Sequence, residues 1–586
     1  MSDERKESRG RQDPGAGAGG FFRRDIVFPA AILFFCIARQ MLVIGMPVFV
    51  RGSTCDDVLM IGMADGLSKG QWLGDYNGLT LMKGCFYPAF VAAAYKLGIP
   101  TLYAITALHT LACGFFVFQL RPLISNSWSL QNSWKCLLLF VLLLFEPASF
   151  AERTFQADYR NSLTILQVLF LFGAVFGLYL NYGKKRLWDF LKAVFIGLSL
   201  VSFWNTREDA IWVLPFVLVG MILVLVRAIW LAGRERRLKK ILFAGFLCVI
   251  PFAFLLGGNE LIRQKNREVY GLPILLEASE GKFAHALRSI YSVRNEEELQ
   301  YVSVSREKLE KLYAVSPSLR SIRGELDRYL VNYDMADRHP GDGEVEDGWF
   351  LWALRRAAFD TGRTRSLAEA ESFYGAVSEE IEAALDDPSG GFERIGTMPS
   401  ALMSPWRAGY LKELPGAMEE GWIMTAAMED TSPSAEATRV SEVNVDLVEQ
   451  LTRGYVIRKK DTDSERLIKA ETACARADFI GSIYRKILPP AAMLALVLFP
   501  VILIAEAKKR KMNPDYFLIM AGILLSQAVM LAGIAYTEIT AFRALRGTYL
   551  AAAYPLTLTC IVLTYFEALE AVKKLEAVKK NDSDTR

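Results

Sequence analysis

Apolar blocks about as long as a bilayer-spanning helix recur along this chain. Each block has roughly 20 residues, the length that an α-helix needs to cross a hydrocarbon core ~30 Å thick. Most blocks have no polar face, whereas a helix of a soluble core shows one every few residues. Hydrophobic residues make up 52% of the 586 residues, which is unusual for a soluble protein of this length. The pattern predicts an all-α polytopic membrane protein.

Strongly basic clusters set the predicted topology. They lie at residues 184–186, 234–240, 508–511 and 573–574. Because Lys and Arg collect on the cytoplasmic side of membrane proteins, all these clusters are expected there. The chain is then a multi-pass cell-membrane protein with both termini in the cytoplasm. The predicted spans are residues 26–50, 101–120, 134–150, 160–180, 187–204, 210–231, 240–258, 487–506, 515–536 and 547–568.

The ends of the chain and the first outer loop differ from the regular spans. Residues 1–25 are polar and Gly-rich, and are expected to be a disordered cytoplasmic tail, with residues 569–586 as a second tail. Residues 26–50 are too long for a signal-peptide core, so they are read as a retained signal anchor. In the first outer loop, residues 51–100, the apolar segment 86–97 is too short for a span. We expect it to form a helix that lies on the outer surface.

Residues 259–486 are the longest outer loop and predict a separate, mainly helical extracytoplasmic domain. Residues 263–480 hold 28 Lys/Arg and 39 Asp/Glu, which leaves 39 Lys/Arg (67 − 28) and 25 Asp/Glu (64 − 39) elsewhere. Because the inserted domain is acidic, no nucleic-acid partner is expected. The domain separates a seven-span module, residues 26–258, from three C-terminal spans, residues 487–568.

Asp56 and Asp57 directly follow the first predicted span. An acidic side chain at a membrane surface can act as a general base on an incoming hydroxyl group. Alternatively, the pair begins a helix that Ser53 or Thr54 caps, since carboxylates stabilise a helix N-terminus. The two interpretations are compatible, and the residues alone do not choose between them.

Roughly the first 230 residues resemble the GT-C membrane glycosyltransferases, a superfamily that includes the aminoarabinose transferase and protein mannosyltransferase families. Its members place an acidic pair just after the first span. A surface helix follows, which begins at a turn containing Lys, Gly and Pro and ends in a Leu-Gly-like stop. Here these features are Asp56-Asp57, residues 83–88, and Lys96-Leu97-Gly98. The chain departs from many relatives because its soluble domain precedes the last three spans.

The resemblance implies an inverting glycosyltransferase whose donor is a sugar on a polyprenyl-phosphate carrier. The implied acceptor is an extracytoplasmic cell-envelope polysaccharide, glycolipid or protein. Because a phosphate leaving group needs no protonation, one carboxylate base and cationic stabilisation suffice. The implied base is Asp56 or Asp57, with Asp56 preferred.

Arginine and lysine side chains on the outer loops are the candidates for binding the donor's phosphate, since guanidinium groups pair with phosphate in bidentate fashion. Each arginine can instead simply extend to the lipid headgroups. The candidate cations are Arg207, Arg160, Lys83, Arg543 and Arg546. The supporting acidic residues are Glu146, Asp158, Glu208 and Asp209.

Arg39 and Glu146 fall nearer to the hydrocarbon core, where a charge is costly and usually faces a cavity or a partner. Glu146 is expected to reach the same cavity as Asp56. Arg39 indicates either such a partner or a first span that is shifted along the sequence. In the inserted domain, Trp406, Trp349 and Trp352 either stack on sugar rings or, more commonly, belong to the core.

The spacing of the three His and eight Cys suggests no zinc or haem site. No metal site is predicted, although the acidic run at residues 342–347 leaves a divalent cation open. Two functions of other classes compete with the glycosyltransferase hypothesis. One is a transporter or flippase of lipid-linked saccharide, and the other is a non-catalytic envelope-assembly protein.

Overall fold

The computed structural model describes most of the chain, and the described residues form helices without a β-strand. The described ranges are 18–50, 56–124, 130–235, 238–297, 299–332, 344–388, 391–396, 403–407, 409–437, 444–459, 461, 464–508 and 513–584.

Eight of the described helices are long and apolar enough to cross a bilayer. They are α4 (Thr101–Ile124), α6 (Asn161–Asn181), α7 (Arg186–Trp204), α8 (Val213–Glu235), α9 (Leu238–Tyr270), α18 (Glu465–Lys508), α19 (Pro514–Thr540) and α21 (Ala553–Asp584). Two further helices, α1 (Ala18–Leu42) and α5 (Leu130–Leu144), contain shorter apolar stretches. The chain is therefore an all-α polytopic membrane protein, as its apolar blocks predict.

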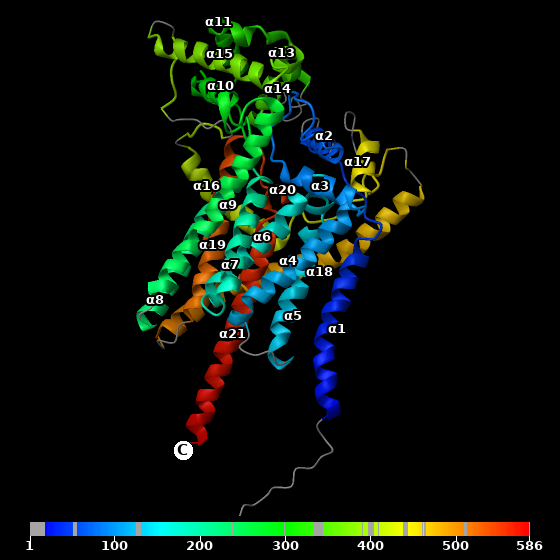
Figure 1. Ribbon diagram of the computed structural model, residues 1–586, viewed down its shortest axis with the longest axis vertical. Helices are drawn as coiled ribbons and strands as arrows, with labels where there is room; N and C mark the ends of the chain where they lie inside the picture. The colour runs from blue at the N-terminus through cyan, green and yellow to red at the C-terminus, as the bar shows by residue number, and fades with distance from the viewer. Residues whose placement is uncertain are drawn as a thin grey trace, which may run out of the picture.

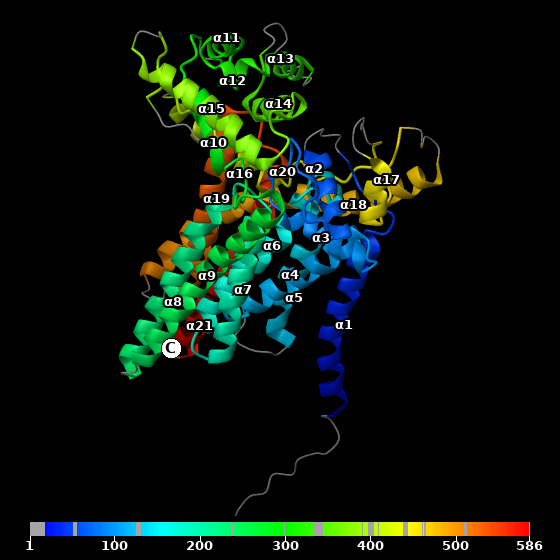
Figure 2. The ribbon, with the colours of Figure 1, turned by 45° about the horizontal axis from the view of Figure 1, so that its top comes forward.

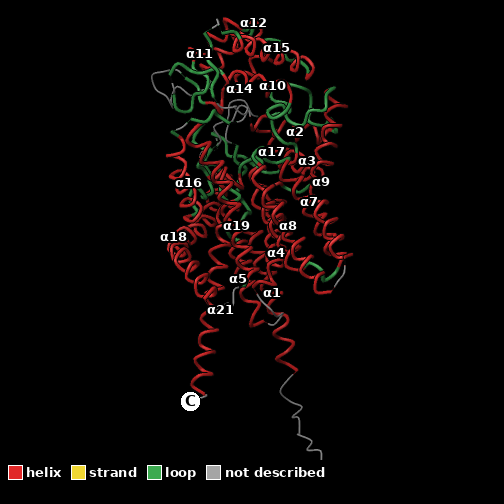
Figure 3. Tube along the Cα trace, turned by 90° about the vertical axis from the view of Figure 1, so that its left-hand side faces the viewer, coloured by secondary structure: helices red, strands yellow, loops and turns green. Residues whose placement is uncertain are grey.

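Polar contacts at one end of the bundle join helices that are far apart in the sequence. The hydroxyl group of Tyr179 and the guanidinium group of Arg227 both donate to Oδ1 of Asp515, at 2.8 and 3.0 Å, which ties α6, α8 and α19 together. Lys135 donates to Glu570 at 2.7 Å and joins α5 to α21 in the same way. The first residues of α1 and the C-terminus both lie at the same end of the molecule (Figures 1 and 3).

The first span is shifted from its predicted position at residues 26–50. Helix α1 runs from Ala18 to Leu42, so Arg39 lies in its last turn. Gly45 adopts a positive φ of 85° and Pro47 follows it, and this combination stops the helix. The chain then continues in an extended segment whose amide of Val48 donates to the Tyr455 carbonyl at 2.8 Å.

Other helix ends also differ from the predicted spans. Helix α5 stops at Leu144 instead of 150, because Pro147 starts a separate 3₁₀ turn, η1 (Pro147–Phe150), which a π turn, η2 (Glu152–Gln156), follows. Helix α9 extends to Tyr270, twelve residues past the predicted end at 258, which adds about 18 Å at ~1.5 Å per residue. Helix α18 likewise begins at Glu465 instead of 487.

The segment predicted as the first outer loop contains two short helices, α2 (Asp56–Lys69) and α3 (Phe86–Lys96). Helix α3 has 11 residues and is too short to cross a bilayer, as predicted. It buries Tyr87, Val91 and Ala94, whereas Leu97 just beyond its end is 74% exposed. Helices α2 and α3 lie at the end of the bundle opposite to the C-terminus (Figure 1).

Six helices from the inserted region form a helical cap at this same end (Figure 2). They are α10 (Gly281–Ser292), α11 (Arg306–Val315), α12 (Pro317–Arg320), α13 (Arg323–Asn332), α14 (Asp347–Asp360) and α15 (Leu367–Asp386). Helix α10 packs against α15, where the Phe283 and Tyr374 rings meet at 4.8 Å. Helix α16 (Tyr410–Ala427) instead packs along α19, with Ala417 against Ala535 and Ile539.

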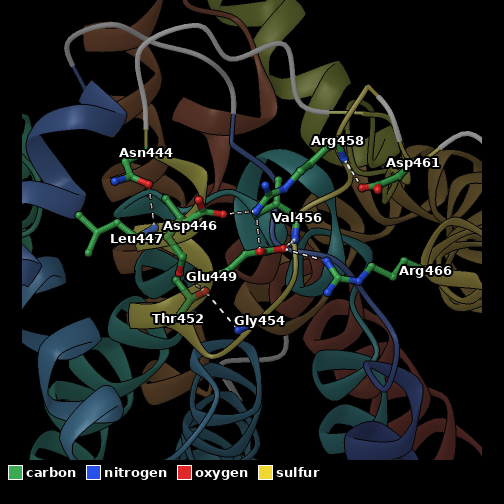
Figure 4. Close-up of polar contacts among 11 residues, drawn as sticks. Asn444, Asp446, Leu447, Glu449, Thr452, Gly454, Val456, Arg458, Asp461 and Arg466 are labelled. Carbon is green, nitrogen blue, oxygen red and sulfur yellow. Dashed lines mark hydrogen bonds and ion pairs between the residues drawn. The ribbon is translucent and has the colours of Figure 1, made fainter. Parts of the chain in front are cut away.

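Helix α17 (Val445–Thr452) lies beside α2 and α3 and carries a polar network of its own (Figure 4). Arg458 donates to Asp446 at 2.6 Å and to Glu449 at 2.8 Å. Nearby, the Arg453 side chain donates to the Tyr95 carbonyl of α3 at 3.2 Å. The α17 segment is therefore hydrogen-bonded to α3 and packs on both α2 and α3.

Candidate functional site

Asp56 and Asp57 form the first turn of α2, so the helix-start interpretation is correct. The proposed caps Ser53 and Thr54 lie outside the described residues. The Asp57 side chain is buried, while 30% of the Asp56 side chain is exposed. The two carboxylates therefore have different surroundings, and Asp56 is the more accessible of the pair.

Lys83 lies between two carboxylates. Its ammonium nitrogen is 3.6 Å from Oδ1 of Asp56 and 3.7 Å from Oε2 of Glu208. Both distances exceed the ~3.2 Å limit of an ordinary N–H···O hydrogen bond, so the ammonium group is held electrostatically by both carboxylates. Its third neighbour is the ring of Trp352, whose centroid is 5.6 Å away.

A close backbone contact brings Lys83 to the turn between α7 and α8. The amide of Phe86 donates to the Asn205 carbonyl at 3.1 Å. A Cβ atom at Gly84 would stand only 2.1 Å from the same carbonyl oxygen, so glycine is required at this position. The Lys-Gly pair thus places an ammonium group beside the charged turn at residues 205–209.

This short turn carries two ion pairs. Arg160, at the start of α6, binds Glu208, and Arg207 binds Asp209 through two hydrogen bonds of 2.6 and 2.7 Å. Arg207 also donates to Oδ1 of Asn161 at 3.0 Å. Burial disfavours the charged form of Glu208, but Arg160 and Lys83 outweigh this effect and lower its pKa to about 2. Glu208 is therefore a permanent anion that keeps both cations in place.

Asp158 lies in a more buried layer next to α3. The Tyr87 hydroxyl donates to Oδ1 of Asp158 at 2.8 Å, and Asp57 is also within electrostatic reach of this hydroxyl. Burial raises the pKa of Asp158 to about 6, although the Tyr87 hydrogen bond opposes the shift. Within the described part of the chain, Oδ2 of Asp158 has no hydrogen-bond partner.

The turn between α19 and α21 approaches the charged residues around Lys83 through its backbone and one tyrosine. Arg207 donates to the carbonyl of Thr548 in α20 (Gly547–Leu550) at 3.4 Å. Tyr549 is within electrostatic reach of Lys83 and Asp56. Arg546 directly precedes α20. Arg543 is exposed and faces Tyr301 of the cap, so it is separated from the other cations.

Glu146 and Arg39 form a different buried group. Arg39 donates to the carbonyl of Ser149 at 2.6 Å, and Oε1 of Glu146 accepts from the Ala148 amide at 3.0 Å. The charged neighbour that acts on Glu146 is Arg39. That Glu146 reaches the same cavity as Asp56 stays a prediction. The occurrence of a charged Arg39 in the first predicted span is explained by the shift of α1 and by the buried hydrogen bond to Ser149.

The three tryptophans of the inserted region differ in their surroundings. Trp352 is buried, which favours its interpretation as a core residue, but its ring also lies over Lys83. Trp406 is 40% exposed and stacks on Tyr536 of α19 at 5.7 Å. Trp349 is partly buried in the cap. No sequence pattern connects Trp352 with Lys83, because the two residues lie far apart along the chain.

Among the described residues, no group of three or more His, Cys, Asp or Glu side chains is arranged to hold a metal ion. Part of the acidic run at 342–347 lies outside the described residues. Its last member, Asp347, accepts a hydrogen bond of 2.5 Å from the Ser303 amide and further bonds from the Ser303 and Ser404 hydroxyl groups. This carboxylate therefore joins three segments of the inserted region.

Comparison with known proteins identifies no family for this chain. No family model and no curated protein matches the chain. A crystal structure of ArnT from Cupriavidus metallidurans in the apo state matches with 14% sequence identity. The match covers 92% of this chain and 78% of that chain, with a TM-score of 0.32. A similarity of this size does not identify a family, and the helices themselves define the class as a multi-pass all-α membrane protein.

Proposed function

We propose that this chain is an inverting glycosyltransferase that moves a sugar from a polyprenyl-phosphate carrier to an extracytoplasmic acceptor. The acceptor class is a cell-envelope polysaccharide, a glycolipid or a protein. The proposal includes cytoplasmic termini, with the cap and the cluster around Lys83 on the outer side. The observation that carries it is the position of Lys83, 3.6 Å from the accessible carboxylate of Asp56 and 3.7 Å from Glu208.

This arrangement supplies the two groups that the reaction requires. In the proposed step, Asp56 accepts the proton of an acceptor hydroxyl group, whose oxygen attacks the anomeric carbon opposite to the phosphate. The bond between the anomeric carbon and the phosphate oxygen breaks, and the phosphate leaves with the electron pair. Lys83 stabilises the charge that develops on this phosphate. A second carboxylate to protonate the leaving group is unnecessary.

The side chains of Lys83, Arg160 and Arg207 are not equally available to a phosphate group. Arg207 is engaged by Asp209 at 2.6 and 2.7 Å, and Arg160 is bound to Glu208. Lys83 has longer contacts to its carboxylates, so an incoming phosphate displaces less from it. We therefore place Lys83 first as the phosphate ligand and assign Arg160 and Arg207 to the surrounding positive field. Arg546 is a more distant candidate, and Arg543 is the weakest.

The proposed donor site is tested by sugar transfer in proteoliposomes with a panel of polyprenyl-phosphate sugars and a membrane glycan extract as acceptor. Lys83→Gln is expected to reduce transfer by at least about 100-fold, since it removes a charge that stabilises the leaving group. Lys69→Gln is the matched control, because Lys69 forms only an exposed pair with Asp65. Equal transfer by the Lys83 and Lys69 variants would exclude the proposed role. Movement of lipid-linked sugar across the bilayer without transfer would instead favour a transporter.

A further inference from the structure

Helix α14 of the cap contacts the Lys83 loop through two residues on one helix face. Trp352 and Arg355 are three positions apart, a spacing that places both side chains on the same side of a helix. The Trp352 ring lies over the Lys83 ammonium group, with 5.6 Å between the ring centroid and Nζ. Arg355 reaches the loop residues just before Lys83. The cap is therefore in direct contact with the proposed donor site.

Arg355 fixes the loop by a buried set of hydrogen bonds. It donates to the carbonyl oxygens of Gly78 at 3.1 Å and Thr80 at 2.9 Å. Its charge is balanced by Glu277, which accepts from Arg355 at 2.5 and 3.0 Å. Both side chains are almost completely buried, at 1% and 0% exposure. The amide of Glu277 also donates to the Leu81 carbonyl at 2.9 Å.

Lys83 is thus held between two anchored points of one loop. On one side, Arg355 and Glu277 bind the backbone at residues 78–81. On the other side, Gly84 rests directly on the Asn205 carbonyl. The Lys83 side chain leaves the loop between these contacts and meets the face of Trp352. Its position is consequently determined by α14 as much as by the membrane helices.

An aromatic face is a suitable neighbour for a cation that must later bind a phosphate. The ring attracts the ammonium group but, unlike a carboxylate, carries no net charge that neutralises it. Trp352 therefore helps to hold the ammonium group near Asp56 without adding a third negative charge beside it. We infer that Trp352 and Arg355 are positioning residues for Lys83, through which the cap takes part in binding the phosphate of a lipid-linked substrate. The identity of this ligand rests on the proposed function.

The test measures binding of decaprenyl phosphate to the full-length protein in lipid nanodiscs. Trp352→Leu is expected to raise the Kd by about 5- to 30-fold, because it removes a desolvated cation–π contact. Trp352→Phe keeps an aromatic face and is expected to stay within about threefold of the wild type. A Trp352→Leu variant that binds as tightly as the wild type would overturn the inference.

A second comparison separates positioning from simple packing. In a Lys83→Gln background, Trp352→Leu is expected to change the Kd by less than about twofold, since its effect passes through the missing ammonium group. An equal loss in both backgrounds would show that Trp352 acts only as a core residue. Tetrafluorotryptophan at position 352 keeps the ring shape but weakens its negative face, so it tests the same contact in a protein that folds normally. No weakening with this residue would also contradict the inference.

Failure of the inference and failure of the proposed function give different results. If wild-type protein does not bind decaprenyl phosphate, the proposed function is wrong. If wild-type protein binds it, Lys83→Gln binds it more weakly, and all Trp352 variants bind normally, only the role of α14 is wrong.

Discussion

Neutralising Glu277 is expected to loosen the cap from the first outer loop. Glu277→Gln keeps the shape of the side chain but leaves the guanidinium group of Arg355 buried without a counter-charge. Arg355 is 1% exposed, so water cannot replace the missing carboxylate. Breaking a buried ion pair by removing one partner costs about 3–5 kcal/mol. Because every ~1.4 kcal/mol is a factor of ten, local opening should become roughly 100- to 4,000-fold more frequent.

Hydrogen–deuterium exchange measures this opening directly at the amides of α14 and residues 75–83. Glu280→Gln is the matched control, since Glu280 pairs with Arg263 and their side chains are 32% and 29% exposed. Exposed pairs contribute about 0–1 kcal/mol, so the control should accelerate exchange by less than about tenfold. If the Glu277 variant exchanges no faster than the Glu280 variant, the buried pair does not hold the cap in place.

Three further predictions concern the site itself. Gly84→Ala should lower sugar transfer by more than about tenfold, since its Cβ would stand 2.1 Å from the Asn205 carbonyl oxygen. Gly62→Ala is the control and should retain transfer, because a Cβ at position 62 would meet no atom within 4 Å. Burial raises the pKa of Asp158 from 3.8 to about 6, so between pH 4 and 6 the folded state keeps a proton that the unfolded state has released, and the wild type loses up to about 3 kcal/mol of stability as the pH rises. Asp158→Asn should remove this pH dependence. Equal pH slopes in the thermal unfolding of both proteins would disprove this. Arg207→Lys should raise the KM for the donor by about tenfold, because lysine cannot reproduce the paired hydrogen bonds to the turn; an unchanged KM would mean that the turn does not shape the site.

The class of fold follows from the sequence because span length and apolar continuity are local properties. The end of the first helix does not follow from hydropathy alone, since residues 43–50 are largely apolar but form a turn followed by an extended segment. Gly45 and Pro47 were the local signals for this break. Helix α3 was predictable as a short helix that does not span the bilayer, because its apolar run is too brief.

The candidate site was only partly predictable, for a physical reason. Asp56, Lys83 and Glu208 were individually recognisable as charges on outer loops. Their mutual distances depend on how the loop after α2 packs on the turn between α7 and α8, which hydropathy does not encode. The contact of Trp352 with Lys83 depends on how the cap docks, and no local pattern in the sequence carries that information.

Sugar transfer by Asp56→Asn and Asp57→Asn variants tests the central claim most directly. Both substitutions preserve size and differ only in which carboxylate is lost, and Asp65→Asn, near the other end of α2, controls for changes of helix charge. We predict that folded Asp56→Asn protein binds decaprenyl phosphate but loses transfer by at least about 100-fold, the usual minimum for a general base. The Asp65 variant should keep nearly normal transfer. Undiminished transfer by the Asp56 and Asp57 variants would contradict the assignment of this carboxylate pair.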